Sequence, residues 1–73
     1  MKPLSGEKVI KVLCKDFGFE ISGQTGSHIR LAKHTSDGKT GTVVPNHKEL
    51  KIGTLRGVLK LAKIDIEEFY KKV

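Results

Sequence analysis

Cysteine, long apolar runs and acidic residues are scarce in this sequence, and the first two shortages exclude whole classes of protein. Cys14 is the single cysteine among 73 residues, so an internal disulfide is impossible and a reducing cytoplasm is the expected setting. No apolar run approaches the roughly 18 residues that span a bilayer, and no signal peptide is visible, so we expect no membrane partner. The chain is also too short for a dinucleotide-binding fold or a barrel, and we expect no small-molecule cofactor.

The shortage of acids leaves a strongly positive chain. Lys and Arg number 14 against 8 Asp and Glu, which gives a formal net charge of +6, and the excess lies in residues 24–63. Such a field attracts a polyanion, either nucleic acid or an acidic protein that imitates one. Hydrophobic residues make up 37% of the chain, enough for one small domain over residues 1–73 with a thin core.

The first element predicted is a helix over residues 5–17. Ser5 is a suitable N-cap, because its hydroxyl can accept from the free amide groups of the first turn. Apolar residues then recur at helical spacing as far as Phe17. Gly18 is a natural stop, since glycine adopts the left-handed conformation at little cost.

Three strand patterns follow, over residues 19–22, 27–34 and 40–44, with a hairpin loop at 23–26 and a turn at 35–38. They predict an antiparallel meander. Side chains alternate along a strand, so Ile29 and Leu31 share one face of the middle strand. If those two are buried under helices, then His28, Arg30 and His34 point into water from the other face.

Two helices complete the predicted layout. Gly53 or Thr54 opens the first of them, and its apolar stripe consists of Leu55, Val58, Leu59 and Ala62. A short helix over residues 66–72 follows, because Asp65 and Glu68 are spaced as a capping box. The expected fold is therefore α+β, with a helix, a three-stranded antiparallel sheet, a helix and a short C-terminal helix.

His28 is the strongest candidate for chemistry. An imidazole exchanges a proton near neutral pH, and Arg30 follows two residues later on the same strand face. Cleavage of RNA by its own 2′-hydroxyl needs a base, an acid and positive charge near the phosphorus, which a histidine beside cations supplies. Ser27 would orient the substrate or His28. The competing interpretation is an ordinary surface histidine.

The other metal-ligating residue types are less informative. His34 lies six residues from His28 on the same strand, about 20 Å away, which is too far to act on the same phosphate. His47 falls in a basic loop, and it is a possible second acid–base group. Cys14 reads as a core residue, and no pair of these residues has a metal-ligand spacing, so the sequence predicts no metal site.

Basic residues other than Arg30 are predicted to contact phosphate without choosing a base sequence. They are Lys33 in the middle strand, Lys48 and Lys51 in the loop before the second helix, and Arg56 and Lys60 on that helix. The alternative is that the helical cations simply form a solvated face.

Three segments together resemble the HicA toxin family of bacterial and archaeal toxin–antitoxin modules. Residues 26–28 resemble the Gly-Ser-His motif of that family, and residues 43–47 resemble its Val-Pro-x-His segment. Residues 49–60 resemble its Glu-Leu-x-x-Gly-Thr-Leu-Arg-x-Ile-Leu-Lys signature. Lys63 departs from the family, which often has glycine at the end of this helix.

This resemblance implies a fold like that of double-stranded-RNA-binding domains. It implies the toxin of a type II toxin–antitoxin module, a cytoplasmic mRNA interferase that cleaves mRNA without a metal and is inhibited by a HicB-type antitoxin. It implies a mechanism that uses a single histidine, and it assigns that histidine to His28. Two alternatives remain open from the sequence: an RNA-binding module without activity, and a basic interaction domain that docks an acidic partner.

Overall fold

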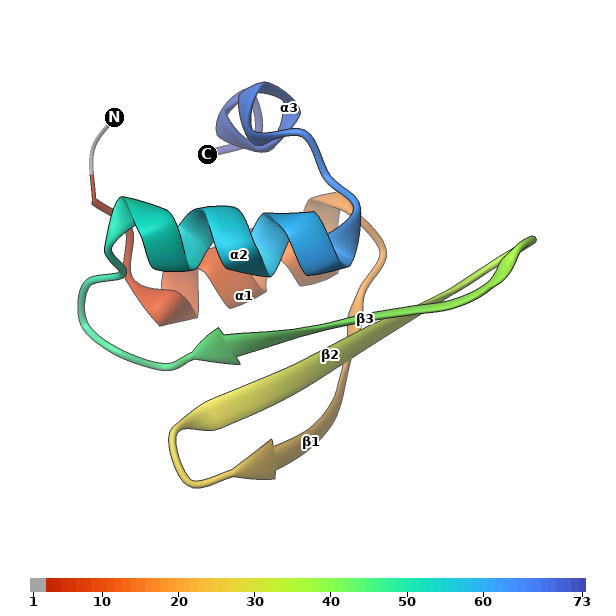
Figure 1. Cartoon of the computed structure of the whole chain (residues 1–73), viewed down its shortest axis with the longest axis horizontal. Coiled ribbons are helices and arrows are strands. Elements are labelled where there is room, and N and C mark those ends of the chain that lie inside the picture. Colours follow the sequence, from red (N-terminus) through yellow and green to blue (C-terminus); the bar gives the residue numbers. More distant parts are fainter. Residues whose placement is uncertain (1–2) are drawn as a thin grey trace.

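The computed structural model describes residues 3–73 and contains six elements. In chain order these are α1 (Gly6–Asp16), β1 (Glu20–Thr25), β2 (His28–Thr35), β3 (Gly38–Pro45), α2 (Ile52–Ala62) and α3 (Ile66–Tyr70). The strands form one antiparallel sheet in the order β1-β2-β3 (Figure 1). The predicted α+β layout is confirmed. None of the helices in this part of the chain is long and apolar enough to cross a membrane.

The core lies between the helices and the sheet face that carries Ile29 and Leu31. Both side chains are buried, whereas His28, Arg30 and His34 of the same strand are exposed, so the predicted alternation is confirmed. In Figure 1 no helix lies in front of β1 and β2. We call the uncovered side, which carries His28, Arg30 and Ala32, the open face. The buried apolar side chains are those of Val9, Val12, Leu13, Phe19, Ile29, Leu31, Val44, Leu50, Leu55, Val58, Leu59, Ala62 and Phe69.

Helix α1 follows its prediction closely. The Ser5 hydroxyl accepts a hydrogen bond from the Lys8 amide at 3.0 Å, as an N-cap does. The helix ends at Asp16, and Gly18 has a φ of 75°. The left-handed conformation of Gly18 turns the chain after the helix, and the next residue, Phe19, is buried in the core.

The hairpin between β1 and β2 differs from the prediction. Strand β1 continues to Thr25, so the turn contains only Gly26 and Ser27, and the loop predicted over residues 23–26 is wrong. The pairing register shifts between Ile21 and Gly23, and this shift is a β-bulge. Pairing with β2 continues after the bulge as far as Thr25. Gly26 has a φ of 58°, and glycine at the first position is typical of a two-residue type II′ turn.

Helix α2 is joined to β3 through a buried hydrogen bond. The Thr42 hydroxyl donates to the Val58 carbonyl at 2.8 Å, in the middle of the helix. The helix begins at Ile52, one residue before the predicted Gly53, and Lys51 precedes it without a side-chain cap. It ends at Ala62, and the next residue, Lys63, caps it: Lys63 has the left-handed φ of 59° and donates its amide to the Leu59 and Lys60 carbonyls.

Helix α3 is shorter than the predicted span of residues 66–72 and ends at Tyr70. One Asp65 carboxylate oxygen accepts from the amides of Glu67 and Glu68 at 3.1 and 3.4 Å, which confirms Asp65 as the cap. The Glu68 carboxylate accepts from the Lys71 ammonium at 3.4 Å.

Candidate nucleic-acid interface

His28 is the first residue of β2 and lies at one end of the open face. Its side chain is exposed, and its strand partners are Thr25 on β1 and Pro45 on β3. The tight turn just before it fixes where β2 starts, while the burial of Ile29 fixes which way the imidazole faces. The ring is therefore accessible to a large substrate on a rigid strand.

Arg30 shares this face and is held in place by β1. Its Nη1 donates to the Thr25 hydroxyl at 3.0 Å. The guanidinium lies over Gly23, and a Cβ at that position would collide with it. Gly23, which the sequence pattern places in a loop, is thus a strand residue that makes room for Arg30. Arg30 is two residues from His28, about 7 Å along the strand.

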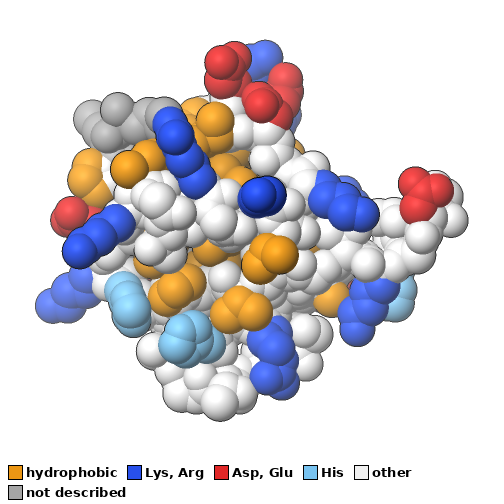
Figure 2. Space-filling model, viewed as in Figure 1, with side chains coloured by type: hydrophobic (Ala, Val, Ile, Leu, Met, Phe, Trp, Pro, Cys, Tyr) orange, Lys and Arg blue, Asp and Glu red, His pale blue; other side chains and the backbone are white. Residues whose placement is uncertain are grey.

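His47 is brought to the same end of the sheet by the segment after β3. The Asn46 amide donates to the Ser27 carbonyl at 2.7 Å, which ties this segment to the turn before His28. The His47 amide donates to the Pro45 carbonyl at 2.9 Å, and its carbonyl accepts from the Gly6 amide at 2.8 Å. Ser27 and His47 are exposed. Figure 2 shows two histidine side chains near one another at this end of the molecule.

Two of the other candidates lie elsewhere. His34 is exposed near the far end of β2, as expected. Lys33 is half-buried on the helix-facing side of the sheet, and its ammonium lies 5.8 Å from the centre of the Phe19 ring. The structure therefore does not bring Lys33 to the face that carries His28. The reason is that side chains alternate along a strand, so Lys33 points to the same face as Ile29 and Leu31.

The remaining predicted cations are all exposed but do not form one surface. Lys48 and Lys51 lie in the segment that leads from the His28 end of the sheet into α2. Arg56 and Lys60 lie on α2 itself. Leu61 of the same helix borders the open face. At 3.6 residues per turn, Arg56 is rotated from Leu61 by about 140° around the helix axis, and Lys60 by about 100°. Lys48 and Lys51 follow the end of β3 that pairs with His28, whereas Arg56 and Lys60 are turned away from the edge of the open face.

A shallow hollow on the open face was not predicted. It has a volume of about 290 Å³. It is lined by Ser22 of β1, by Arg30, Leu31 and Ala32 of β2, by Lys39, Gly41, Thr42 and Val43 of β3, and by Leu61 of α2. We call it the sheet hollow. An exposed leucine outside the apolar stripe of α2 is a signal that the sequence contains. The lining from β3, however, depends on the strand register and could not be inferred.

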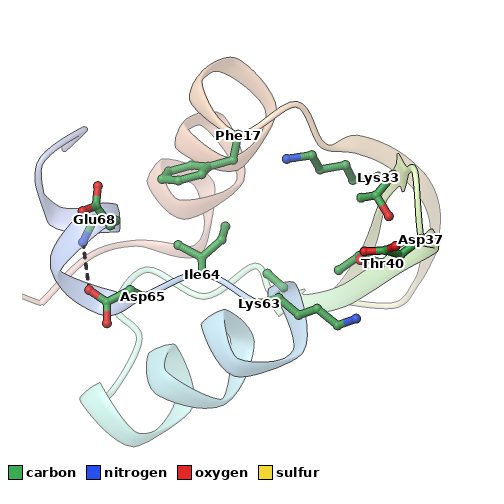
Figure 3. Close-up of a pocket in the computed structure, with 10 residues that line it drawn as sticks. Phe17, Lys33, Asp37, Thr40, Lys63, Ile64, Asp65 and Glu68 are labelled. Atoms are coloured by element: carbon green, nitrogen blue, oxygen red, sulfur yellow. Dashed lines mark hydrogen bonds between the residues drawn. The ribbon is translucent and has the colours of Figure 1, made fainter.

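A larger cavity lies on the other side of the sheet (Figure 3). It has a volume of about 390 Å³ and is lined by side chains that include Phe17, Lys33, Asp37, Lys63 and Glu68. Its charges are of both signs, and no histidine lines it. This cavity therefore offers neither an acid–base group of near-neutral pKa nor a uniformly positive wall.

Cys14 is a partly buried residue of α1. Burial raises the pKa of its thiol, and the nearby Glu20 carboxylate raises it further. The thiolate is the nucleophilic form of cysteine, so a raised pKa argues against a catalytic Cys14. Among residues 3–73, no three His, Cys, Asp or Glu side chains are grouped as metal ligands are.

Comparison with known proteins identifies a family. The model described as the HicA toxin of bacterial toxin–antitoxin matches residues 6–64, which is most of the chain. The matched span contains His28, Arg30 and His47, and it ends just before α3. Searches of curated proteins and of solved structures returned no match.

Proposed function

This chain belongs to the HicA toxin family of bacterial toxin–antitoxin modules. We propose that this toxin is an endoribonuclease that cleaves mRNA without a metal and uses His28 as a catalytic acid–base group. One observation carries the proposal: an exposed imidazole stands next to a fixed guanidinium on a sheet face that no helix covers. An extended polyanion can lie on such a face, and the net charge of +6 attracts it.

The proposed reaction uses the nucleophile that RNA itself carries. The 2′-hydroxyl gives its proton to a base and attacks the adjacent phosphorus, so that the 2′-O–P bond forms and the P–O5′ bond breaks. The leaving 5′-oxygen takes up a proton from an acid, so the products are a 2′,3′-cyclic phosphate and a 5′-hydroxyl. Arg30 stabilises the charge that gathers on the phosphorane oxygens, and Ser27 orients the substrate or the imidazole.

The reaction needs an acid as well as a base, and His47 is the second imidazole at this end of the sheet. Its backbone is fixed to Pro45 on one side and to the start of α1 on the other. A histidine pair would divide the two proton transfers, with one ring accepting from the 2′-hydroxyl and the other donating to the 5′-oxygen. We include His47 in the proposed site as the partner of His28.

The proposed partners follow from the same surface. The substrate is mRNA, which places the activity in the cytoplasm. The antitoxin is a HicB-type protein with acidic groups that inhibits the toxin by covering His28 and Arg30. Charge of opposite sign speeds such an encounter and sets its orientation.

The test is incubation of the purified protein with end-labelled RNA in EDTA, beside three histidine variants. We expect the wild type to cut, and His28→Ala to lose activity by at least about a hundredfold, the usual contribution of an acid–base group. His47→Ala should lose activity similarly. His34→Ala is the matched control, because it removes an exposed imidazole of the same strand face and should cut normally.

Each contrary result has a definite meaning. Full cutting by His28→Ala removes His28 from the mechanism, and loss of wild-type cutting in EDTA indicates a metal-dependent enzyme. RNA that is bound but left intact indicates a binding module. Absence of RNA binding at low salt, together with tight binding to an acidic neighbour, indicates an interaction domain.

A further inference from the structure

The sheet hollow is a feature of the open face that the proposed reaction leaves unused. It lies beyond Arg30 as seen from His28, with Ala32 and Gly41 as directly paired residues at its floor. We propose that it is a subsite for one unpaired base of the RNA strand whose phosphate is cleaved at His28. This inference rests on the proposed function, since it names where a neighbouring nucleotide binds.

Gly41 gives the first argument, because the fold does not need a glycine there. Its φ is not in the left-handed region, unlike that of Gly26. A Cβ built on Gly41 would meet the Leu31 carbonyl at 3.5 Å, an ordinary contact. Glycine in a strand costs about 0.5–1 kcal/mol relative to alanine. An avoidable glycine in the middle of β3 thus leaves open space on the sheet, as a closely approaching ligand requires.

The walls of the sheet hollow give the second argument. Val43 and Leu61 form an apolar side, and Leu61 is 58% exposed to water. Arg30 and Lys39 supply cations at the rim, and no carboxylate lines the space. A nucleobase matches this combination, because its faces are weakly hydrated and it is attached to an anionic backbone. In Figure 2, hydrophobic side chains gather in the middle of this view, with histidines and cations around them.

The position of the sheet hollow relative to His28 gives the third argument. Ala32 lies four residues after His28 on the same face, about 13 Å along the strand. An RNA strand that runs along β2 with its phosphate at His28 can therefore place a flanking base over Ala32 and Gly41. Arg30 lies between the two points and can contact the intervening backbone.

The test fills the sheet hollow without weakening the sheet. Gly41→Val places a β-branched side chain in a strand, so its melting temperature should equal or exceed that of the wild type. Its affinity for a short 2′-O-methyl RNA, which cannot be cleaved, should fall by about tenfold, the value of one base contact. Gly41→Ala should show a smaller loss. If Gly41 has only a structural role, Gly41→Val will have a higher melting temperature and an unchanged affinity for the RNA. That result overturns the proposal.

A second pair of variants keeps the test decisive if Gly41→Val is poorly folded. Leu61→Ala removes a wall of the sheet hollow, whereas Ile21→Ala removes an apolar side chain of similar exposure, 60%, from a position outside it. We expect RNA affinity to fall only in the first variant. Equal effects of the two variants count against the subsite.

Two further measurements separate this inference from the proposed function and from a protein occupant. In the first, one nucleotide of the RNA lacks its base. When that nucleotide is the one whose base would enter the sheet hollow, the wild type and Gly41→Val should bind the RNA equally. RNA that binds normally to every variant, while an acidic antitoxin binds only the wild type, overturns the proposal in favour of a protein-docking site. A wild type that binds RNA through the sheet hollow yet never cuts it rejects the nuclease function and leaves the subsite standing.

Discussion

Lys63 adopts a backbone conformation that residues with a Cβ disfavour. Its φ of 59° ends α2, and the left-handed region costs a non-glycine residue roughly 1–2 kcal/mol. Replacing Lys63 by glycine should raise the free energy of unfolding by about 0.5–1 kcal/mol, since the larger entropy of unfolded glycine offsets part of the gain. Urea unfolding measures the change.

Two other variants isolate the backbone effect of Lys63. Lys63→Ala removes the same charge and keeps the disfavoured φ, so it should not be stabilised. Lys60→Gly places glycine inside the helix and should lose about 1 kcal/mol. Equal stability of Lys63→Gly and Lys63→Ala would show that the conformation carries no cost.

Single residues also show how far the site could be predicted from sequence. The placement of His28 and Arg30 follows from alternation along one strand with buried Ile29 and Leu31, and it is confirmed. The charge of Lys33 alone predicts a place at the interface, but the same alternation puts it on the opposite face. The role of Gly23 was missed, because a bulge changes which residues pair and leaves no mark in a period-two pattern.

At the scale of elements, α2 is positioned on β3 by apolar packing and by one buried hydrogen bond. The Thr42 hydroxyl donates to the Val58 carbonyl across this joint. Thr42→Val keeps the shape of the side chain and removes the donor, so it should lower the free energy of unfolding by about 1 kcal/mol. Thermal and urea unfolding measure the loss.

Thr40→Val is the matched control for that joint. Thr40 is buried two residues earlier on the same strand face, and the hydrogen bond to the Val58 carbonyl comes from Thr42 and not from Thr40. We expect it to be neutral or slightly stabilising, because valine favours a strand. A loss as large as that of Thr42→Val would assign the effect to burial and not to the bond with α2.

The elements show which information a sequence contains and which it does not. Caps and periodicity gave every helix and strand, with ends displaced by a few residues, as at Thr25 and Tyr70. The sheet hollow needed two further facts: the register that sets Gly41 opposite Ala32, and the placement of Leu61 beside β3. Both depend on how elements meet in space, which local patterns do not encode.

At the scale of the whole molecule, only some of the basic residues behind the net charge of +6 lie on or near the proposed RNA surface. Arg30 and Lys39 line the sheet hollow, and Lys48 and Lys51 follow the His28 end of the sheet. Lys33 lies on the helix-facing side. Affinity for a polyanion should therefore depend on where a cation lies and not on how many cations the chain carries.

The salt dependence of RNA binding measures this distribution. If three or four of these cations contact phosphates, the slope of log affinity against log salt concentration for an uncleavable single strand should be about −2 to −3. Arg30→Ala should make the slope shallower by about 0.7, the value of one phosphate on a single strand. Lys33→Ala changes the net charge equally and should leave the slope unchanged, because its ammonium lies over Phe19 on the other side of the sheet. An equal change of slope in both variants would mean that RNA affinity depends on total charge, and it would contradict the open face as the binding surface.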